Sequence, residues 1–124
     1  MMSFITHAKT PRAIINQFWS FVFRTAIFRV VPTFQYLPTI HFLDKTRYSA
    51  FAATDLNLRL RERKINEVHL VGVCTDICVL HTAIDAYNNA FDIVIPKDCV
   101  ASFNQIGHDW ALAHFQNTLA AYVV

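Results

Sequence analysis

The sequence predicts an α/β domain built on a parallel β-sheet. Apolar runs of strand length alternate with segments whose apolar residues recur at helical spacing, a pattern typical of strand–helix–strand units with right-handed crossovers. One run, EVHLVGV at residues 67–73, is apolar almost throughout, as is typical of a parallel strand covered on both faces. A length of 124 residues and an apolar content of 54% suit a single domain with a buried core.

The first regular elements are expected after Pro38. TIHFL, at residues 39–43, is rich in β-forming residues and is predicted to be a short strand that leads into a loop. Asp55 offers an N-cap for a helix over residues 56–64, in which Leu56 and Leu60 share one face. The strand at residues 67–73 comes next along the chain.

The second half of the chain continues the alternation. A helix is predicted from Asp76, a strand over residues 91–98, a helix over residues 108–119 and a final strand over residues 120–124. The apolar positions that define the two helices are Ile77, Leu80, Ile84 and Tyr87 in the first, and Ala111, Phe115 and Leu119 in the second.

The formal net charge of +2 conceals an uneven distribution. Residues 1–43 contain four Lys or Arg residues and no acidic residue, whereas the remainder is weakly acidic. That remainder resembles an ordinary cytosolic enzyme and offers no basic surface, so we expect no nucleic-acid partner. The chain has only three cysteines, an odd number, so a disulfide framework is not expected. This favours a reducing, cytoplasmic location.

Residues 1–41 form an atypical, aromatic and acid-free segment for which several interpretations stay open. Polar residues interrupt it too often for a membrane-spanning helix, which needs about 20 nearly uncharged residues. Its arginines resemble those of an organellar transit peptide or a membrane-surface helix. Packing against the rest of the domain is the more general expectation for apolar residues. A further interpretation is that this segment was never selected to fold with residues 42–124.

Cys78 is a candidate nucleophile because it lies in the first turn of a helix that follows a buried strand. Ligands bind beyond the carboxyl ends of parallel strands, and a helix N-terminus favours a thiolate or holds an oxyanion. Position alone still favours Cys74 and Cys78 as small buried hydrophobic residues, since thiol activation also needs an electropositive neighbour.

Other constellations in the sequence are less informative. The cysteine spacing is C-x-x-x-C and the histidines are scattered, so zinc is disfavoured. A basic run on the helix over residues 56–64 favours a solvated face over an anion site. That run comprises Arg59, Arg61, Arg63 and Lys64.

Two motifs that occur in the right order, DKTRYSAF at residues 44–51 and TDICV at residues 75–79, resemble the isochorismatase-like cysteine hydrolases, in particular the nicotinamidase/pyrazinamidase branch. The likeness extends from about Phe42 to about Tyr122. It implies a doubly wound parallel sheet in a Rossmann-like, three-layer α/β fold. Residues 42–124 would be the C-terminal part of such a hydrolase domain, with the N-terminal strands missing or replaced.

The resemblance also implies roles for individual residues. A Cys, a Lys and an Asp form the family's catalytic triad, and the matching motifs assign the nucleophile to Cys78 and the lysine to Lys45. The resemblance further implies a cis peptide bond between Val73 and Cys74, with an oxyanion hole made of the backbone N–H groups of Cys74 and Cys78. The residues implied to line or support the substrate pocket are Tyr48 and Phe51.

These implied roles agree with the chemistry of the side chains. An ammonium at Lys45 would supply the electropositive neighbour that holds Cys78 as a thiolate. The thiolate would attack the carboxamide carbon of a small-molecule amide, ammonia would leave, and water would hydrolyse the thioester. Isochorismate cleavage hydrolyses a vinyl ether and needs no thiol, so nicotinamide is the expected substrate, in a reaction of NAD salvage.

The chain departs from the family pattern in its N-terminal part, where the family's triad Asp and metal ligands lie. No cofactor is identifiable and no metal ligand can be assigned, although members of the family can bind zinc, iron or manganese there. We therefore expect a truncated, impaired nicotinamidase-type cysteine amidohydrolase, unless Asp44, Asp76 or a partner subunit replaces the acid. The alternatives are a catalytically inactive remnant or binding module of the family, and a membrane-associated or imported protein.

The same departures have two expected structural effects. Ala53, Ala90 and Ala120 stand where glycines are expected, so positive φ angles there would add local strain. Without the family's N-terminal strands, the strand at residues 67–73 would expose an unpaired apolar edge unless residues 12–37 cover it. Such an edge would favour self-association.

Overall fold

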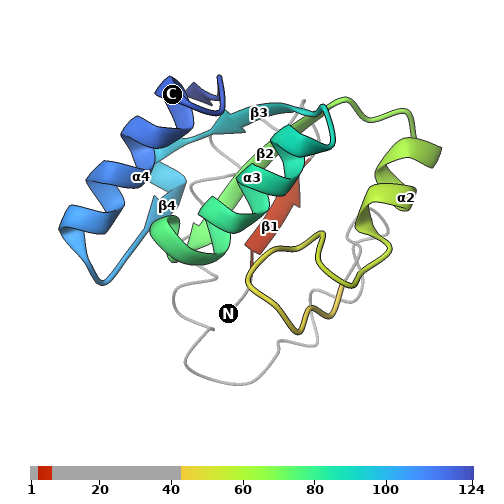
Figure 1. Ribbon diagram of the computed structural model, residues 1–124, viewed down its shortest axis with the longest axis horizontal. Helices are drawn as coiled ribbons and strands as arrows, with labels where there is room; N and C mark the ends of the chain where they lie inside the picture. Colours follow the sequence, from red (N-terminus) through yellow and green to blue (C-terminus); the bar gives the residue numbers. More distant parts are fainter. Residues whose placement is uncertain (1–2, 7–42) are drawn as a thin grey trace.

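The computed structural model describes residues 3–6 and 43–124, which form one sheet with helices packed on it (Figure 1). In chain order the strands are β1 (Ser3–Thr6), β2 (Glu67–Val73), β3 (Asp92–Ile95), β4 (Val100–Ala101) and β5 (Tyr122–Val123). The helices are α2 (Leu56–Glu62), α3 (Leu80–Asn88) and α4 (Gln105–Asn117), with a π-helical turn η2 (Thr75–Val79) and a 3₁₀ turn η3 (Lys97–Cys99).

The sheet is parallel from β2 onward. Its strands follow the order β1-β2-β3-β5, and β4 pairs with β2 beyond the end of β3. Glu67 lies opposite Asp92 in the β2–β3 pair, and Val94 lies opposite Tyr122 in the β3–β5 pair. Parallel neighbours need a crossover, and α3 and α4 supply these crossovers. The predicted α/β fold with a parallel sheet is therefore confirmed.

The other edge of β2 is paired by β1, which runs antiparallel to it. Ser3 lies opposite Gly72 and Thr6 lies opposite His69. The prediction of an unpaired edge is wrong for this stretch, because a strand near the start of the chain supplies the missing hydrogen-bond partners. Residues 12–37, which were the expected cover, lie outside the described residues. Self-association stays a prediction.

The element boundaries differ in how well the sequence predicts them. The strand at residues 67–73 is confirmed in full, and α4 begins at Gln105, before the predicted residue 108. The strand predicted over residues 91–98 ends at Ile95, before Pro96, which cannot donate a ladder hydrogen bond. The strand predicted over residues 39–43 lies outside the described residues except for Leu43, which is in no strand.

Helix α2 begins where the sequence predicts but is not capped as expected. Asp55 occupies the N-cap position, yet its side chain makes no capping bond to the backbone. Its carboxylate instead accepts a hydrogen bond from Arg59 Nε at 2.7 Å, one turn along the helix. Leu60 is the buried residue of this helix, in agreement with the predicted face.

Helices α3 and α4 lie side by side on one face of the sheet and bury the core against it (Figure 1). The predicted stripe of α4 is confirmed, since Ala111, Phe115 and Leu119 are buried. The predicted stripe of α3 is wrong at Tyr87, whose side chain is 49% exposed. The small side chains of α3 face the sheet instead, and its buried residues are Leu80, Thr82, Ala83 and Ala86.

The three alanines predicted to stand in for glycines do have positive φ angles. The values are 56° at Ala53, 57° at Ala90 and 50° at Ala120. Ala90 follows the end of α3, where Phe91 N–H donates back to Ala86 O at 3.0 Å, the long bond of a Schellman C-cap. A side chain in this left-handed region is strained, since the Cβ approaches the following carbonyl.

No helix within the described part of the chain is long and apolar enough to span a membrane.

Candidate active site

The candidate site lies at the carboxyl end of β2, where the chain turns sharply into α3. The peptide bond between Val73 and Cys74 is cis, and the π-helical turn η2 begins at the next residue. Ile77 N–H and Val79 N–H both donate to Cys74 O at 3.2 Å. The α-helix predicted from Asp76 therefore starts as a wider turn, a feature that recurs at functional sites.

Cys78 sits inside this turn and is completely buried. Cys74 is also buried, at the N-cap of η2, where its carbonyl accepts the two bonds that close the turn. The structure thus brings both predicted cysteines to the end of β2. The assignment of Cys78 as nucleophile and of the Cys74 and Cys78 N–H groups as oxyanion donors stays a prediction.

The loop that carries Lys45 precedes α2 and packs against α3. Lys45 Nζ donates hydrogen bonds to the carbonyl oxygens of Arg47 and Tyr48, both at 3.0 Å. These two bonds fold the side chain back over its own loop and fix the position of the ammonium. The pairing of this ammonium with Cys78 stays a prediction of the family resemblance.

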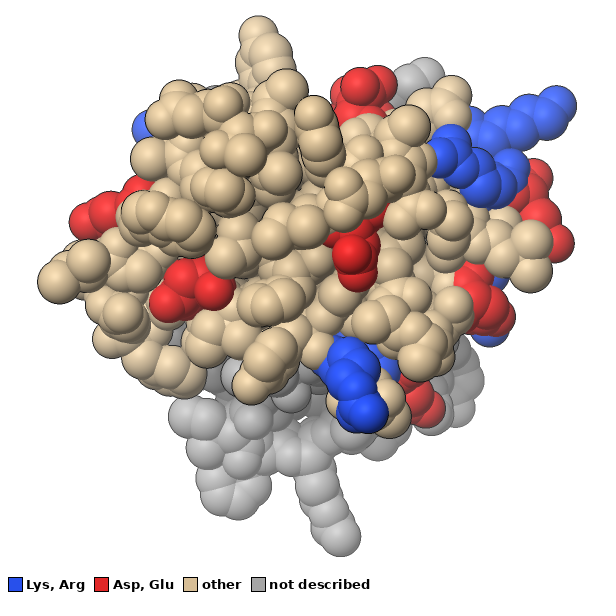
Figure 2. All heavy atoms as spheres, viewed as in Figure 1, with Lys and Arg blue, Asp and Glu red and all other residues tan. Residues whose placement is uncertain are grey.

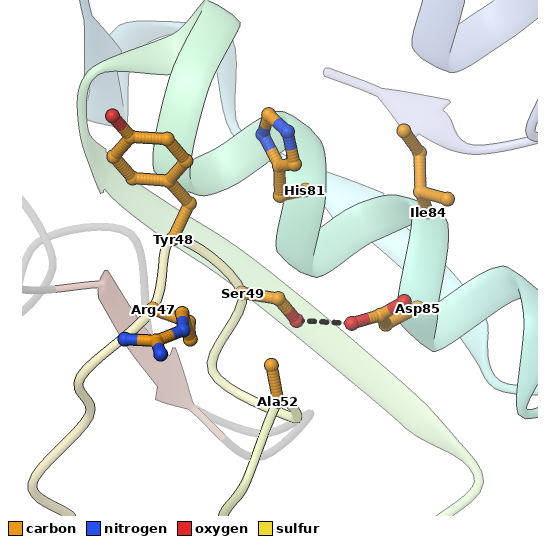
Figure 3. A pocket seen from close by; sticks show the side chains of 7 residues that line it. All are labelled: Arg47, Tyr48, Ser49, Ala52, His81, Ile84 and Asp85. Atoms are coloured by element: carbon orange, nitrogen blue, oxygen red, sulfur yellow. Dashed lines mark hydrogen bonds between the residues drawn. The ribbon is translucent and has the colours of Figure 1, made fainter.

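Two residues at the buried base of this loop contact α3. The Ser49 hydroxyl donates to an Asp85 carboxylate oxygen (Figure 3). The Ala50 N–H donates to Thr82 Oγ1 at 3.0 Å. Ser49 and Ala50 are both buried. The loop is therefore attached to α3, the helix that directly follows the turn carrying Cys78.

A pocket of about 320 Å³ opens between this loop and α3 (Figure 3). The rings of Tyr48 and His81 meet at its edge, with centroids 5.4 Å apart and planes tilted by 51°. Phe51 does not line this pocket, because its ring packs against Phe91 at 5.8 Å and joins the core. The pocket is lined by Arg47, Tyr48, Ser49, Ala52, His81, Ile84 and Asp85.

The other side of the turn is attached to α4. Thr75 is fully buried, and its hydroxyl is hydrogen-bonded to His108 Nδ1 at 2.8 Å. The Ser102 hydroxyl donates to the Asp76 carboxylate. The second carboxylate oxygen of Asp76 would lie only 2.3 Å from a Cβ at position 107, so the close approach requires Gly107. The N-terminal end of α4 carries a partial positive charge, which favours the Asp76 carboxylate that lies beside its first turn.

These anchors were not found from the sequence, although one signal was present. Gly107 directly precedes the helix predicted over residues 108–119, and an isolated glycine beside an element often marks a close approach by another group. The partners Asp76 and Thr75 lie more than thirty positions earlier in the chain, so no local pattern predicts the contact.

The described residues do not fit a metal centre. Among residues 3–6 and 43–124, no three His, Cys, Asp or Glu side chains come together as a ligand set. The family's ligands lie in its N-terminal part, where this chain has no acidic residue.

Acidic and basic side chains are interspersed on the face that carries α3 and α4, and Figure 2 shows no extended basic patch there. Arg61 illustrates how the basic run of α2 is used: its guanidinium stacks 4.1 Å over the Phe91 ring and donates to Asn89 O. The guanidinium thus covers one face of a buried ring of the core, in a cation–π contact. The absence of a nucleic-acid partner stays a prediction.

A profile of the isochorismatase domain matches residues 5–124. The chain belongs to the isochorismatase family. The predicted family is thereby confirmed, and with it the isochorismatase-like α/β fold. The match also includes most of the residues before position 42. The assignment of residues 1–41 as an atypical segment, apart from the hydrolase domain, stays a prediction.

Individual members of the isochorismatase family are closely similar. PncA of Bacillus subtilis, described as an uncharacterized isochorismatase family protein, is 60% identical over 98 residues, which are 77% of this chain and 54% of the relative. The crystal structure of the Staphylococcus aureus nicotinamidase SaPncA is 61% identical with a TM-score of 0.72, over 74% of this chain and 59% of that one. The crystal structure of nicotinamidase PncA from Bacillus subtilis is 59% identical with a TM-score of 0.72, over 74% and 50%.

The predicted likeness to the nicotinamidase branch is confirmed by these structures. The chain spans about half the length of the curated relatives that it matches.

Proposed function

We propose that this chain is a nicotinamidase-type cysteine amidohydrolase, which converts nicotinamide to nicotinate and ammonia through a thioester on Cys78. The observation that carries the proposal is the position of Cys78, buried in a π-helical turn at the carboxyl end of β2. The loop of Lys45 is attached to the helix that continues this turn. Similarity to nicotinamidases supports the choice of substrate.

The proposed reaction has two halves. The Cys78 thiolate attacks the carboxamide carbon, and the electron pair of the C=O bond moves to oxygen, where backbone N–H groups of the Cys74–Cys78 turn stabilise it. Collapse of this intermediate breaks the C–N bond, and the nitrogen leaves as ammonia after taking up a proton. Water then attacks the thioester carbon, which releases nicotinate and regenerates the thiolate.

The departing ammonia needs a proton. The family's triad Asp would carry it, and residues 1–43 contain no acidic residue. Asp76 is a poor substitute, because its carboxylate is held by Ser102 and faces Gly107 of α4. Loss of a general acid or base lowers turnover by about 10²–10⁴-fold, so we expect slow catalysis.

The second candidate function is that of a catalytically inactive member of the family. The missing acid favours it, because the attack on the amide would then lack its proton carrier. In that case the fold and the Cys78 turn would serve binding rather than turnover. The two candidates differ in whether the purified chain forms nicotinate.

Product analysis tests the proposal. The purified chain is incubated with nicotinamide, and nicotinate and ammonia are quantified by chromatography and by an ammonia assay. We expect equal amounts of both in water. When hydroxylamine is added, nicotinohydroxamate should form at the expense of nicotinate, since hydroxylamine competes with water for a thioester. Hydrolysis of isochorismate in preference to nicotinamide would overturn the substrate assignment, and the absence of any product would favour the inactive candidate.

A further inference from the structure

The hydroxyl of Thr82 is hydrogen-bonded in two directions in the interior of the protein. Thr82 lies on α3, one turn after Cys78, and is fully buried. Its Oγ1 donates to Cys78 O at 2.7 Å and accepts a hydrogen bond from Ala50 N–H at 3.0 Å. One oxygen atom therefore joins the turn that carries Cys78 to the loop that carries Lys45.

We propose that Thr82 is a positioning residue, which fixes the Lys45 loop against the Cys78 turn. The inference rests on the proposed function, because it assigns Lys45 and Cys78 as a working pair. Thr82 itself touches neither the substrate nor the reacting atoms in this proposal. It acts through the main chain of the loop.

The bond from Ala50 distinguishes Thr82 from an ordinary helical threonine. Threonine hydroxyls in helices commonly donate to the carbonyl four residues earlier, as Thr82 does to Cys78. That back bond leaves the lone pairs of the hydroxyl oxygen available. Here a backbone N–H from a segment 32 positions away uses one of them, so the hydroxyl connects two elements that are distant in sequence.

The Lys45 loop is stiff enough to transmit a shift at Ala50. Thr54 Oγ1 donates to Ala50 O at 2.6 Å, and Ser49 Oγ accepts from Phe51 N–H at 3.1 Å. The carbonyls that hold the Lys45 ammonium belong to residues that directly precede Ser49. A movement of Ala50 away from α3 would therefore move the ammonium as well.

The contact between Ser49 and Asp85 is a second attachment of the same loop, farther along α3 (Figure 3). It joins two side chains at the pocket, and Asp85 is only half-buried. Of the two attachments, the one through Thr82 also reaches the residue proposed as nucleophile. This is why the inference concerns Thr82 rather than Asp85.

Removal of the hydroxyl should weaken catalysis more than it disturbs the fold. Valine has nearly the same shape as threonine but can neither accept from Ala50 N–H nor donate to Cys78 O. The loop would then move to find another partner for the buried N–H group, because such groups rarely stay unpaired. A misplacement of catalytic groups by about 1 Å can lower the rate by about 10²-fold.

The test compares Thr82→Val with Thr82→Ser, which keeps the hydroxyl, and with Thr118→Val. Thr118→Val is the control, because it makes the same substitution at the exposed C-terminal end of α4, outside the Lys45 loop and the Cys78 turn. Thr82→Ala removes the same hydroxyl without added bulk and is used if the valine variant does not fold. Each variant is first checked for a cooperative thermal transition.

Two readouts are measured on each variant: kcat and KM for nicotinamide, and the rate at which iodoacetamide alkylates Cys78 at pH 7, followed by mass spectrometry of the Cys78 peptide. The alkylation rate reports both the thiolate and the access of the reagent to the buried Cys78, and it is defined even if nicotinamide is not a substrate. We expect Thr82→Val to lower kcat by about 10²-fold and alkylation by about tenfold. Thr82→Ser should stay within about twofold of the parent because it keeps the hydroxyl, and Thr118→Val should do so because it lies away from the loop and the turn.

A double-mutant cycle with Lys45→Met tests whether Thr82 acts through the lysine. In the Lys45→Met background, Thr82→Val should change the alkylation rate by less than about twofold, because the ammonium that it positions is gone. A Thr82→Val protein that melts at a lower temperature but keeps the parent's kcat and alkylation rate would overturn the inference. So would an equal loss of alkylation with and without Lys45.

Discussion

Replacement of Gly107 by alanine should destabilise the protein, although alanine is the better helix former. Gly107 lies in the first turn of α4, against the carboxylate of Asp76 in the Cys78 turn. A Cβ built on Gly107 would lie 2.3 Å from Asp76 Oδ2 and 3.0 Å from Asp76 Cγ. The first distance is about 1 Å shorter than the 3.4 Å at which ordinary van der Waals contact begins. Either the carboxylate or the start of α4 must therefore move.

The size of the effect follows from three opposing contributions. Alanine in a helix interior is favoured over glycine by about 1 kcal/mol. An added methyl group in a tightly packed site costs about 1–3 kcal/mol. A displaced carboxylate also loses the hydrogen bond from Ser102, and bonds to charged groups contribute about 1.5–3 kcal/mol. We expect a net loss of about 1.5–5 kcal/mol in the free energy of unfolding.

Urea unfolding of four proteins tests this prediction: the parent, Gly107→Ala, Asp76→Ala and the double variant. In the Asp76→Ala background the clash is absent, so alanine at position 107 should be neutral or stabilising by up to about 1 kcal/mol. The coupling energy between the two positions should then be about 3 kcal/mol. A Gly107→Ala variant that is more stable than the parent, with no coupling to position 76, would contradict the close approach described for this pair.

Further predictions concern the helix ends, the core and the anchor of the Cys78 turn. Ala90→Gly and Ala120→Gly should each raise the free energy of unfolding by about 0.5–1 kcal/mol, since relief of left-handed strain outweighs the extra freedom of glycine in the unfolded chain; thermal unfolding checks this. Phe115→Ala should lower the free energy of unfolding by about 3–5 kcal/mol, because it leaves a cavity in place of the largest fully buried side chain among the described residues; an unchanged urea midpoint would contradict the described core. Thr75→Val should slow alkylation of Cys78 while Thr75→Ser does not, since only serine keeps the bond to His108; equal rates in both variants would count against this anchor.

The fold was predictable where the sequence carries a strong local pattern. The run at residues 67–73 forms β2 in full, and its apolar character agrees with the burial of Val68, Leu70, Val71 and Gly72. The buried stripe of α4 was also predictable, because its apolar residues recur at helical spacing. Tyr87 misled the assignment of α3, because the small residues Ala83 and Ala86 pack against the sheet and leave the larger ring outside.

Other features depend on contacts that no local pattern contains. Strand β4 has only two residues and exists because it meets β2 beyond the end of β3. The π-helical form of η2 is set by how the turn joins β2 to α3, whereas hydrophobic spacing indicates only a helix. The pairing of β1 with β2 likewise joins segments more than sixty positions apart.

The candidate site was predictable through its motifs but not through its supports. The position of Cys78 after a buried strand suggested a nucleophile, and the family resemblance added Lys45. The hydrogen bonds of Thr82, Asp76 and Thr75 join segments that only the folded chain brings together. Polar residues of this kind look like ordinary helix or loop residues in the sequence, because their partners are far along the chain.

The most direct test of the central claim is ammonia release from nicotinamide by the intact 124-residue chain, measured beside Cys78→Ala and Cys99→Ala. Both variants remove a buried thiol of the same domain, so they share the general effect of losing one sulfur atom. We expect slow release by the parent and by Cys99→Ala, and none above background by Cys78→Ala. Equal release by Cys78→Ala and the parent would show that the reaction does not pass through a thioester on Cys78.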